Sequence, residues 1–237
     1  MVTTLSRRVK DRAWRLLLKL LLRPRGHGAL ARLGTGYGGW IVPRSLLRPG
    51  AVCYLAGVGE DASFDLALID AGCEVVSIDP TPRAVAYAET IRGTEPRFRL
   101  LPVGLWDADT TQRFYAPRDP GHVSHSITNL QGSSEYFTAE CRSVASLMAE
   151  LGHSRLDLLK LDIEGAEYAV FESLRRDRIS PAVICVELHQ TLPFRGILRA
   201  VRQLERRDYV VRAVDGWNVT LVGPEMDATR SDAPQRA

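Results

Sequence analysis

Side chains that could do acid–base chemistry stand at the end of a predicted buried strand. Residues 156–163 form an apolar run that contains Asp162 and leads into Glu164 and Gly165. An α/β enzyme builds its site in this way, because the carboxyl ends of buried parallel strands deliver polar groups to one edge of the sheet. Glycine there lets a ligand or another backbone approach closely. The alternative is that both acids only cap the following helix.

A second apolar run, over residues 181–188, carries Glu187 and is followed directly by His189. If both runs are strands of one parallel sheet, their ends meet at the same edge, beside Asp162. Histidine is the usual general base near neutral pH, so His189 is the first candidate for that role. The carboxylates of Asp162, Glu164 and Glu187 could then orient the base or a substrate hydroxyl. A single histidine can equally be structural.

A nucleotide site is predicted nearer the N-terminus. A strand over residues 51–56 runs into a turn containing Gly57 and Gly59, and a helix and a second strand ending in Asp79 and Pro80 follow. Strand, glycine turn, helix, strand and acid form the nucleotide-binding half of a doubly wound fold. A carboxylate at position 79 could accept both hydroxyls of a ribose. Such a glycine turn also occurs as a plain loop.

The charges in this turn indicate which nucleotide binds. Glu60 and Asp61 stand where a dinucleotide's pyrophosphate would meet the helix N-terminus. Repulsion between one of these carboxylates and a phosphate ~4 Å away would cost ~4 kcal/mol at a surface-like dielectric. S-adenosyl-L-methionine has no phosphate and carries a sulfonium and an ammonium, which carboxylates attract. The turn therefore favours S-adenosyl-L-methionine over NAD, unless the two acids only cap the helix and face water.

These segments resemble the FkbM family of S-adenosylmethionine-dependent methyltransferases, over roughly residues 35–222. The matching segments are residues 37–40, 57–61, 64–65, 79–82, 102–106, 124–127, 159–167 and 186–189. The most specific is Leu-Lys-Leu-Asp-Ile-Glu-Gly-Ala-Glu at 159–167. The resemblance implies an enzyme that usually methylates hydroxyl oxygens of sugars, polyketides or other secondary metabolites. The chain departs from the general methyltransferase glycine motif at Asp61, where a third glycine is common.

The expected fold class is α/β: a Rossmann-like class I methyltransferase with a doubly wound, mostly parallel seven-stranded sheet. Residues 209–214 and 217–222 flank an Asp-Gly turn and predict an antiparallel C-terminal hairpin. We expect one methyltransferase domain over residues 33–222 and a disordered tail over 223–237. In such folds Gly104, after the third predicted strand, meets the edge of the adenine.

Residues 107–140 do not fit a simple crossover helix. Two short strands are expected there, separated by a polar loop that contains His122, Ser124 and His125. Loops of this length in compact domains usually serve a function, so we interpret the insert as a lid over the substrate pocket. His125 becomes the second candidate base. The alternative is a surface excursion without a role.

The N-terminal segment is strongly basic. Residues 1–32 hold nine Lys or Arg and one Asp, a net charge of +8, which leaves −5 for the rest of a chain whose formal charge is +3. Residues 5–23 predict an amphipathic helix whose apolar run, interrupted by Lys19, is too short to span a bilayer. Such a helix could lie on an anionic membrane surface. Alternatively its leucines pack on the domain or on a second subunit.

Composition is that of an ordinary soluble protein of 237 residues, with 45% hydrophobic and 25% charged residues. Its four cysteines lack Cys-x-x-Cys spacing and are expected to be reduced core residues of a cytoplasmic protein. No bound metal is expected. The alternative is Mg²⁺ held by Asp162, Glu187 and His189, although histidine is a poor Mg²⁺ ligand.

The expected activity is in-line transfer of a methyl group from S-adenosyl-L-methionine to a small-molecule hydroxyl acceptor. No nucleic-acid partner is expected, because the basic residues are confined to one segment. Two other classes stay open: an NAD(P)-dependent oxidoreductase, which the acids of the glycine turn disfavour, and a non-catalytic module that kept the fold.

Overall fold

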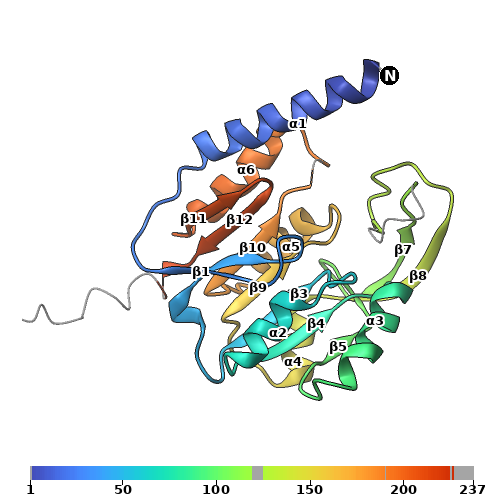
Figure 1. Ribbon diagram of the computed structural model, residues 1–237, viewed down its shortest axis with the longest axis vertical. Helices are drawn as coiled ribbons and strands as arrows, with labels where there is room; N and C mark the ends of the chain where they lie inside the picture. Colours follow the sequence, from blue (N-terminus) through green and yellow to red (C-terminus); the bar gives the residue numbers. More distant parts are fainter. Residues whose placement is uncertain (1, 119–124, 190, 225, 227–237) are drawn as a thin grey trace, which may run out of the picture.

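A computed structural model of the chain describes residues 2–118, 125–189, 191–224 and 226, and for residues 2–8 and 10 the backbone alone. Its centre is a seven-stranded sheet with helices on both faces (Figure 1). The strands, in their order across the sheet, are β11 (Val210–Asp215), β12 (Asn218–Val222), β10 (Val183–Glu187), β9 (Leu158–Leu161), β3 (Val52–Ala56), β4 (Glu74–Ile78) and β5 (Leu100–Leu101).

The direction of the strands confirms the predicted fold class. From β5 to β10 all neighbours pair in parallel, and β12 and β11 form the antiparallel hairpin at the other edge. The chain leaves β3 towards β4 on one side and later returns to β9 on the other. The order therefore reverses between β3 and β9, which is where open α/β sheets bind their ligands.

Side chains of β3 divide the core in two because successive residues of a strand face opposite sides. Val52, Tyr54 and Ala56 join one hydrophobic cluster, and Cys53 and Leu55 join the other. The first cluster is covered by α4 (Val144–Leu151), α5 (Glu167–Arg176), α6 (Phe194–Glu205) and part of α1 (Val2–Leu21). The second is covered by α2 (Ser63–Asp70) and α3 (Pro82–Arg92).

Two helices begin where the sequence supplies a capping hydroxyl. The side chain of Thr81 accepts a hydrogen bond from the N–H of Ala84, and Pro82 fills the first helical position of α3. Ser143 caps α4 in the same way. Such caps satisfy N–H groups that the helix itself leaves unpaired, so the helix boundaries follow from the local sequence.

Residues 24–50 are rich in glycine and proline, yet they contain a hairpin. Strands β1 (Leu30–Leu33) and β2 (Trp40–Pro43) pair antiparallel, and a 3-10 turn, η1 (Arg44–Leu46), follows. Trp40, Val42 and Leu46 are buried against the second core cluster. The sequence does not reveal this hairpin, because each strand has only four residues and is ordered by packing on the face of the main sheet.

The predicted insert, residues 107–140, forms a three-stranded sheet with the residues that flank it: β6 (Gly104–Leu105), β8 (Tyr136–Arg142) and β7 (Thr110–Tyr115). It lies at one edge of the main sheet (Figure 1). His122 and Ser124 of its loop lie outside the described residues, as does most of the predicted tail. All four cysteines are buried and free, as expected.

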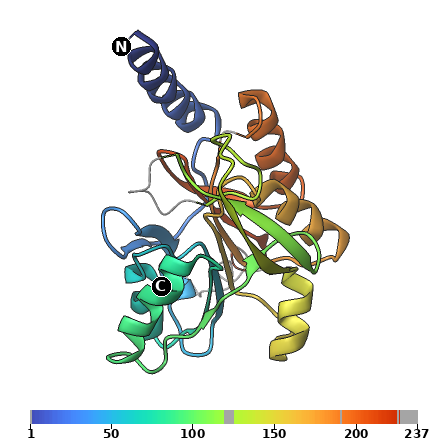
Figure 2. The ribbon, with the colours of Figure 1, turned by 90° about the vertical axis from the view of Figure 1, so that its right-hand side faces the viewer.

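No helix within the described ranges is both long enough and apolar enough to cross a membrane. In Figure 2, α1 extends away from the rest of the molecule with its N-terminal end outermost. Its C-terminal half is attached to the domain, where Leu18 and Leu22 are fully buried.

A buried acid lies inside the second core cluster. The side chain of Asp65, on α2, is 4% exposed and accepts a hydrogen bond from the hydroxyl of Ser77 on β4. Burial raises the pKa of Asp65 to about 6 despite this hydrogen bond. The folded state therefore holds this proton more tightly than the unfolded chain does.

This shift gives the folding stability a defined pH dependence. Because its pKa is raised on folding, Asp65 contributes most to the free energy of unfolding at a pH below its unfolded pKa. This contribution is lost as the pH rises through about 6. Relative to Asp65→Asn, the wild type should lose about 2 kcal/mol of unfolding free energy between pH 4 and pH 7. Urea denaturation at several pH values measures this difference. The exposed Asp70→Asn on the same helix should instead run parallel to the wild type; equal profiles for both variants would contradict the assignment.

Candidate active site

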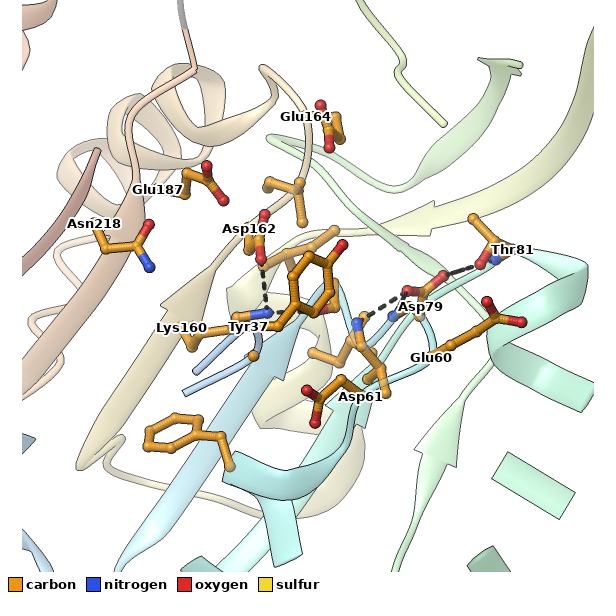
Figure 3. A pocket seen from close by; sticks show the side chains of 18 of the residues that line it. Tyr37, Glu60, Asp61, Asp79, Thr81, Lys160, Asp162, Glu164, Glu187 and Asn218 are labelled. Atoms are coloured by element: carbon orange, nitrogen blue, oxygen red, sulfur yellow. Dashed lines mark hydrogen bonds and ion pairs between the residues drawn. The ribbon is translucent and has the colours of Figure 1, made fainter. Parts of the chain in front are cut away.

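A cavity of about 540 Å³ opens at the carboxyl edge of the sheet, above β3, β4, β9 and β10 (Figure 3). Its volume is in the usual range for small-molecule sites. Most of the predicted site residues line it: Gly57, Gly59, Glu60, Asp61, Asp79, Pro80, Gly104, His125, Asp162, Glu164 and Glu187. Further polar residues line it as well, among them Lys160 and Asn218.

The glycine turn after β3 lies against the end of β9. Ala56 is paired with Leu161, so the next residues, Gly57 and Asp162, lie side by side. Gly57 has φ of +85°, and a Cβ atom there would lie 1.8 Å from the backbone oxygen of Asp162. Only glycine permits both the backbone conformation and this approach. The turn is thereby fixed over the switch point of the sheet.

Asp79 holds this turn from β4. Its Oδ2 accepts hydrogen bonds of 2.9 Å from the N–H groups of both Val58 and Gly59. Its Oδ1 accepts from the N–H and the hydroxyl of Thr81, at 2.8 and 2.6 Å. The carboxylate lines the cavity but is only 5% exposed. Supporting the turn is therefore a role the sequence did not reveal, and the ribose contact remains a prediction.

The two acids of the turn have partners of their own. Glu60 pairs with Arg83 at 2.5 Å, and both side chains are exposed. Asp61 accepts a hydrogen bond from the N–H of Ser63, at the start of α2, and another from the hydroxyl of Thr35. Asp61 thus binds the first N–H group of α2 from the residue before the N-cap, Ala62. Its carboxylate lies at the helix N-terminus that a pyrophosphate would need.

One buried ammonium faces the carboxylates of the site. Lys160 on β9 is 7% exposed, donates a hydrogen bond to the backbone oxygen of Gly57 and lies 3.4 Å from Oδ2 of Asp162. Burial opposes ionisation of Asp162, but the charges of Lys160 and His189 outweigh it and lower the pKa. For Glu187, burial and the neighbouring Asp162 together raise the pKa to about 8. The pair thus has one ionised and one readily protonated carboxyl.

His189 is enclosed by two other carboxylates. Its Nδ1 lies 2.7 Å from Oε1 of Glu167, which is fully buried, and its Nε2 lies 3.2 Å from Oε2 of Glu164. Burial opposes the charged imidazole, but these two contacts outweigh it and raise its pKa to about 12. At neutral pH both ring nitrogens are protonated and paired. This geometry does not favour His189 as a general base, the role the sequence suggested.

His125 lies at the insert side of the cavity, with its ring edge-on to Phe137 at 5.2 Å. The insert touches the carboxyl edge of the sheet directly, because Ser126 donates a hydrogen bond of 2.7 Å to the backbone oxygen of Glu164. Gly104 has no room for a side chain: a Cβ there would lie 2.5 Å from the ring of Phe114. The insert therefore forms a wall of the cavity, next to the position expected for the adenine.

Lys160, Tyr37 and Asn218 are among the lining residues that were not predicted. Lys160 lies within the apolar run of its strand and was overlooked there, although a charged residue in such a run could have indicated a site. Tyr37 comes from the loop between β1 and β2, is 83% exposed and turns its ring into the cavity on the side of Asp162 (Figure 3). Asn218 stands opposite Glu187 in the antiparallel ladder of β10 and β12. Its position follows from strand register, which sequence alone does not give.

A metal could be held by a set that differs from the predicted one. One ligand atom from each of Asp162, Glu164 and His189 lies within 4.8 Å of the others, and Glu187 is not in the group. A cation there would need His189 to lose a proton that two glutamates stabilise. Mg²⁺ also prefers oxygen ligands. The donor set thus fits Mg²⁺ poorly.

Comparison with known proteins bears on this site. A family model described as "Methyltransferase FkbM domain" matches residues 55–211. "Probable methyltransferase-like protein 24" of Rattus norvegicus is 24% identical over 170 residues, which cover 66% of this chain and 40% of that protein. The Homo sapiens protein of the same name is 28% identical over 122 residues, covering 51% and 27%. The chain thus matches less than half the length of these relatives.

Two solved structures share a similar arrangement. Fibrillarin of Aeropyrum pernix, in complex with natively bound S-adenosyl-L-methionine, has a TM-score of 0.42 and 9% identity, covering 85% of this chain and 86% of that one. Precorrin-6Y C5,15-methyltransferase of Geobacter metallireducens has a TM-score of 0.39 and 13% identity, covering 83% and 71%. At these values neither likeness bears on the function.

The contact between Gly57 and Asp162 can be tested directly. Gly57→Ala should lower the unfolding free energy by roughly 3 kcal/mol or more, from a strained φ and a clash with backbone. Gly50→Ala is the matched control, because Gly50 has φ of +73° but a Cβ added to it would meet no atom within 4 Å. Urea unfolding of both variants isolates the clash. Equal losses of unfolding free energy in both variants would show that β9 moves to make room for the new side chain and that the contact does not constrain the fold.

Proposed function

Because the chain belongs to the FkbM family of methyltransferases, we propose that it transfers the methyl group of S-adenosyl-L-methionine to a hydroxyl oxygen of a small-molecule acceptor. The observation that carries the proposal is the acidic cavity at the switch point between β3 and β9. Sugars, polyketides and related secondary metabolites are the acceptors expected. The cytoplasmic location and the absence of a nucleic-acid partner remain predictions.

The residues of the cavity fit this cofactor. Its lining carries the carboxylates of Glu60, Asp79 and Asp162, and two cations, Arg15 and Lys160. Lys160 is engaged by Gly57 and Asp162. An acidic lining attracts a sulfonium and an ammonium and repels phosphate. The carboxylate of Asp61 at the start of α2 supports the same choice and argues against NAD(P).

We assign the base to the carboxyl pair at the ends of β9 and β10. When bound, the cofactor supplies a methyl carbon open to in-line attack by oxygen. The proton of the acceptor hydroxyl passes to Glu187, whose pKa of about 8 suits proton uptake near neutral pH. Asp162 holds that pKa up by its negative charge. His189 keeps the loop at Glu164 in place as a paired imidazolium, and His125 is the second candidate base.

The single experiment for the proposal is calorimetric titration with S-adenosylhomocysteine and, separately, with NAD⁺. We expect S-adenosylhomocysteine alone to bind, with a Kd in the micromolar range. Asp79→Asn should weaken it at least tenfold, because its amide cannot accept on both sides of the turn. Glu89→Gln, exposed on α3, is the control and should bind normally. Binding of NAD⁺ alone would establish an oxidoreductase, and binding of neither would indicate a non-catalytic module.

The pH dependence of turnover tests the base. Once a hydroxyl acceptor is found by screening for release of S-adenosylhomocysteine, kcat should rise with pH up to about 8 and then level off, because the ionised Glu187 accepts the proton. Glu187→Gln should lower kcat by roughly 10²–10⁴-fold and remove this rise, while leaving the affinity for S-adenosylhomocysteine unchanged. If His125→Gln has that effect and Glu187→Gln does not, the base is His125.

A further inference from the structure

Helix α1 is attached to the domain along one stripe. Leu18 and Leu22 are fully buried, and the ring of Trp14 packs against Phe194 of α6 at 5.3 Å. The indole N–H of Trp217 donates a hydrogen bond of 2.8 Å to Asp11, the one acidic residue of the helix. These contacts fix the rotation of α1 about its axis. The faces it leaves outside are therefore determined by the fold.

A second stripe of α1 is apolar and exposed. Val9 and Leu16 are each 62% exposed, Leu20 is 58% exposed, and Leu17 and Leu21 are each 40% exposed. Within the described part of the chain, these are five of the eight large hydrophobic side chains that are exposed. Residues 9, 16 and 20 follow helical spacing, so they lie along one face. An exposed apolar stripe of this size marks a docking surface.

A third stripe, beside the apolar one, is basic. Arg12, Lys19 and, just after the helix, Arg23 follow one another at spacings of seven and four residues and are exposed. The acid of this segment, Asp11, is turned to the domain side, where it bonds to Trp217 and pairs with Arg15. The outward part of α1 thus offers apolar and cationic side chains together. A surface that complements both is itself apolar and anionic, as the headgroup region of an acidic bilayer is.

The same helix borders the cavity. Arg15 of α1 lines it together with Asp215, Gly216 and Trp217 from the β11–β12 hairpin on which the helix rests. Figures 1 and 2 show α1 on the outside of the molecule, with its N-terminal end projecting beyond the domain. Arg15 thus connects α1 with the rim of the cavity.

We propose that the exposed face of α1 docks this protein on an anionic lipid bilayer. The leucines enter the boundary between headgroups and acyl chains, and the basic stripe meets the acidic headgroups. A second copy that packs through the same face of α1 would bury the leucines equally well but would bring two cationic stripes together. The bilayer is a partner in addition to those of the proposed function, and the docking itself does not depend on methyl transfer.

Sedimentation with lipid vesicles tests the docking. The full chain should bind vesicles that contain phosphatidylglycerol and stay in solution with phosphatidylcholine alone, and the binding should weaken as salt is raised. Changing both leucines, Leu16→Gln with Leu20→Gln, should weaken binding at least tenfold. Leu130→Gln is the control, because Leu130 is an exposed leucine (38%) of the insert and not of α1.

Every other outcome contradicts the proposal in an identifiable way. Failure to bind anionic vesicles overturns it. Vesicle binding that survives the leucine changes, together with equal binding to an oligonucleotide, would mean a nucleic-acid surface. A dimer seen by light scattering that the leucine changes abolish would mean that a second copy covers the stripe. Titration of the same protein with S-adenosylhomocysteine separates the two proposals, because the leucine variants should bind it as the wild type does.

Discussion

The site depends on one buried ammonium. Lys160 connects the turn after β3 to the acid after β9, by a hydrogen bond to Gly57 and a contact with Asp162. A buried charge is costly unless it is paired. The ends of β3 and β9 therefore cannot separate without leaving an unpaired ammonium in the interior. The glycine at position 57 completes the constraint, because it lets the backbones meet without a side chain between them. The cavity has a rigid floor for this reason.

Around this floor the carboxylates divide into two groups with different chemistry. Glu164 and Glu167 face one imidazole, and the cation they share removes His189 from acid–base work. Asp162 and Glu187 face each other with less positive charge around them, so one of them, Glu187, holds a proton near neutral pH. Residues of the same type at the same sheet edge therefore acquire different roles from their neighbours alone.

The sequence predicted the sheet and its edge well, because buried parallel strands are continuous apolar runs and the acids that end them are conspicuous. It could not predict the partners of those acids. Glu167 reaches His189 from the first turn of α5, and Asp79 turns back to the glycine loop instead of simply facing the cavity. Both contacts depend on tertiary packing. The β1–β2 hairpin escaped prediction because its short strands carry no strong periodicity and gain order only on the sheet.

The position of β12 bears on how the site is made during synthesis. This strand comes after the other strands of the sheet in chain order, pairs with both β10 and β11, and places Asn218 beside Glu187. The cavity wall also uses Arg15, from α1. A growing chain on the ribosome therefore has α1 to α6 available before it can close the pocket. Assembly must wait for residues 218–222 to emerge, and the half-finished sheet exposes the edge of β10 until then.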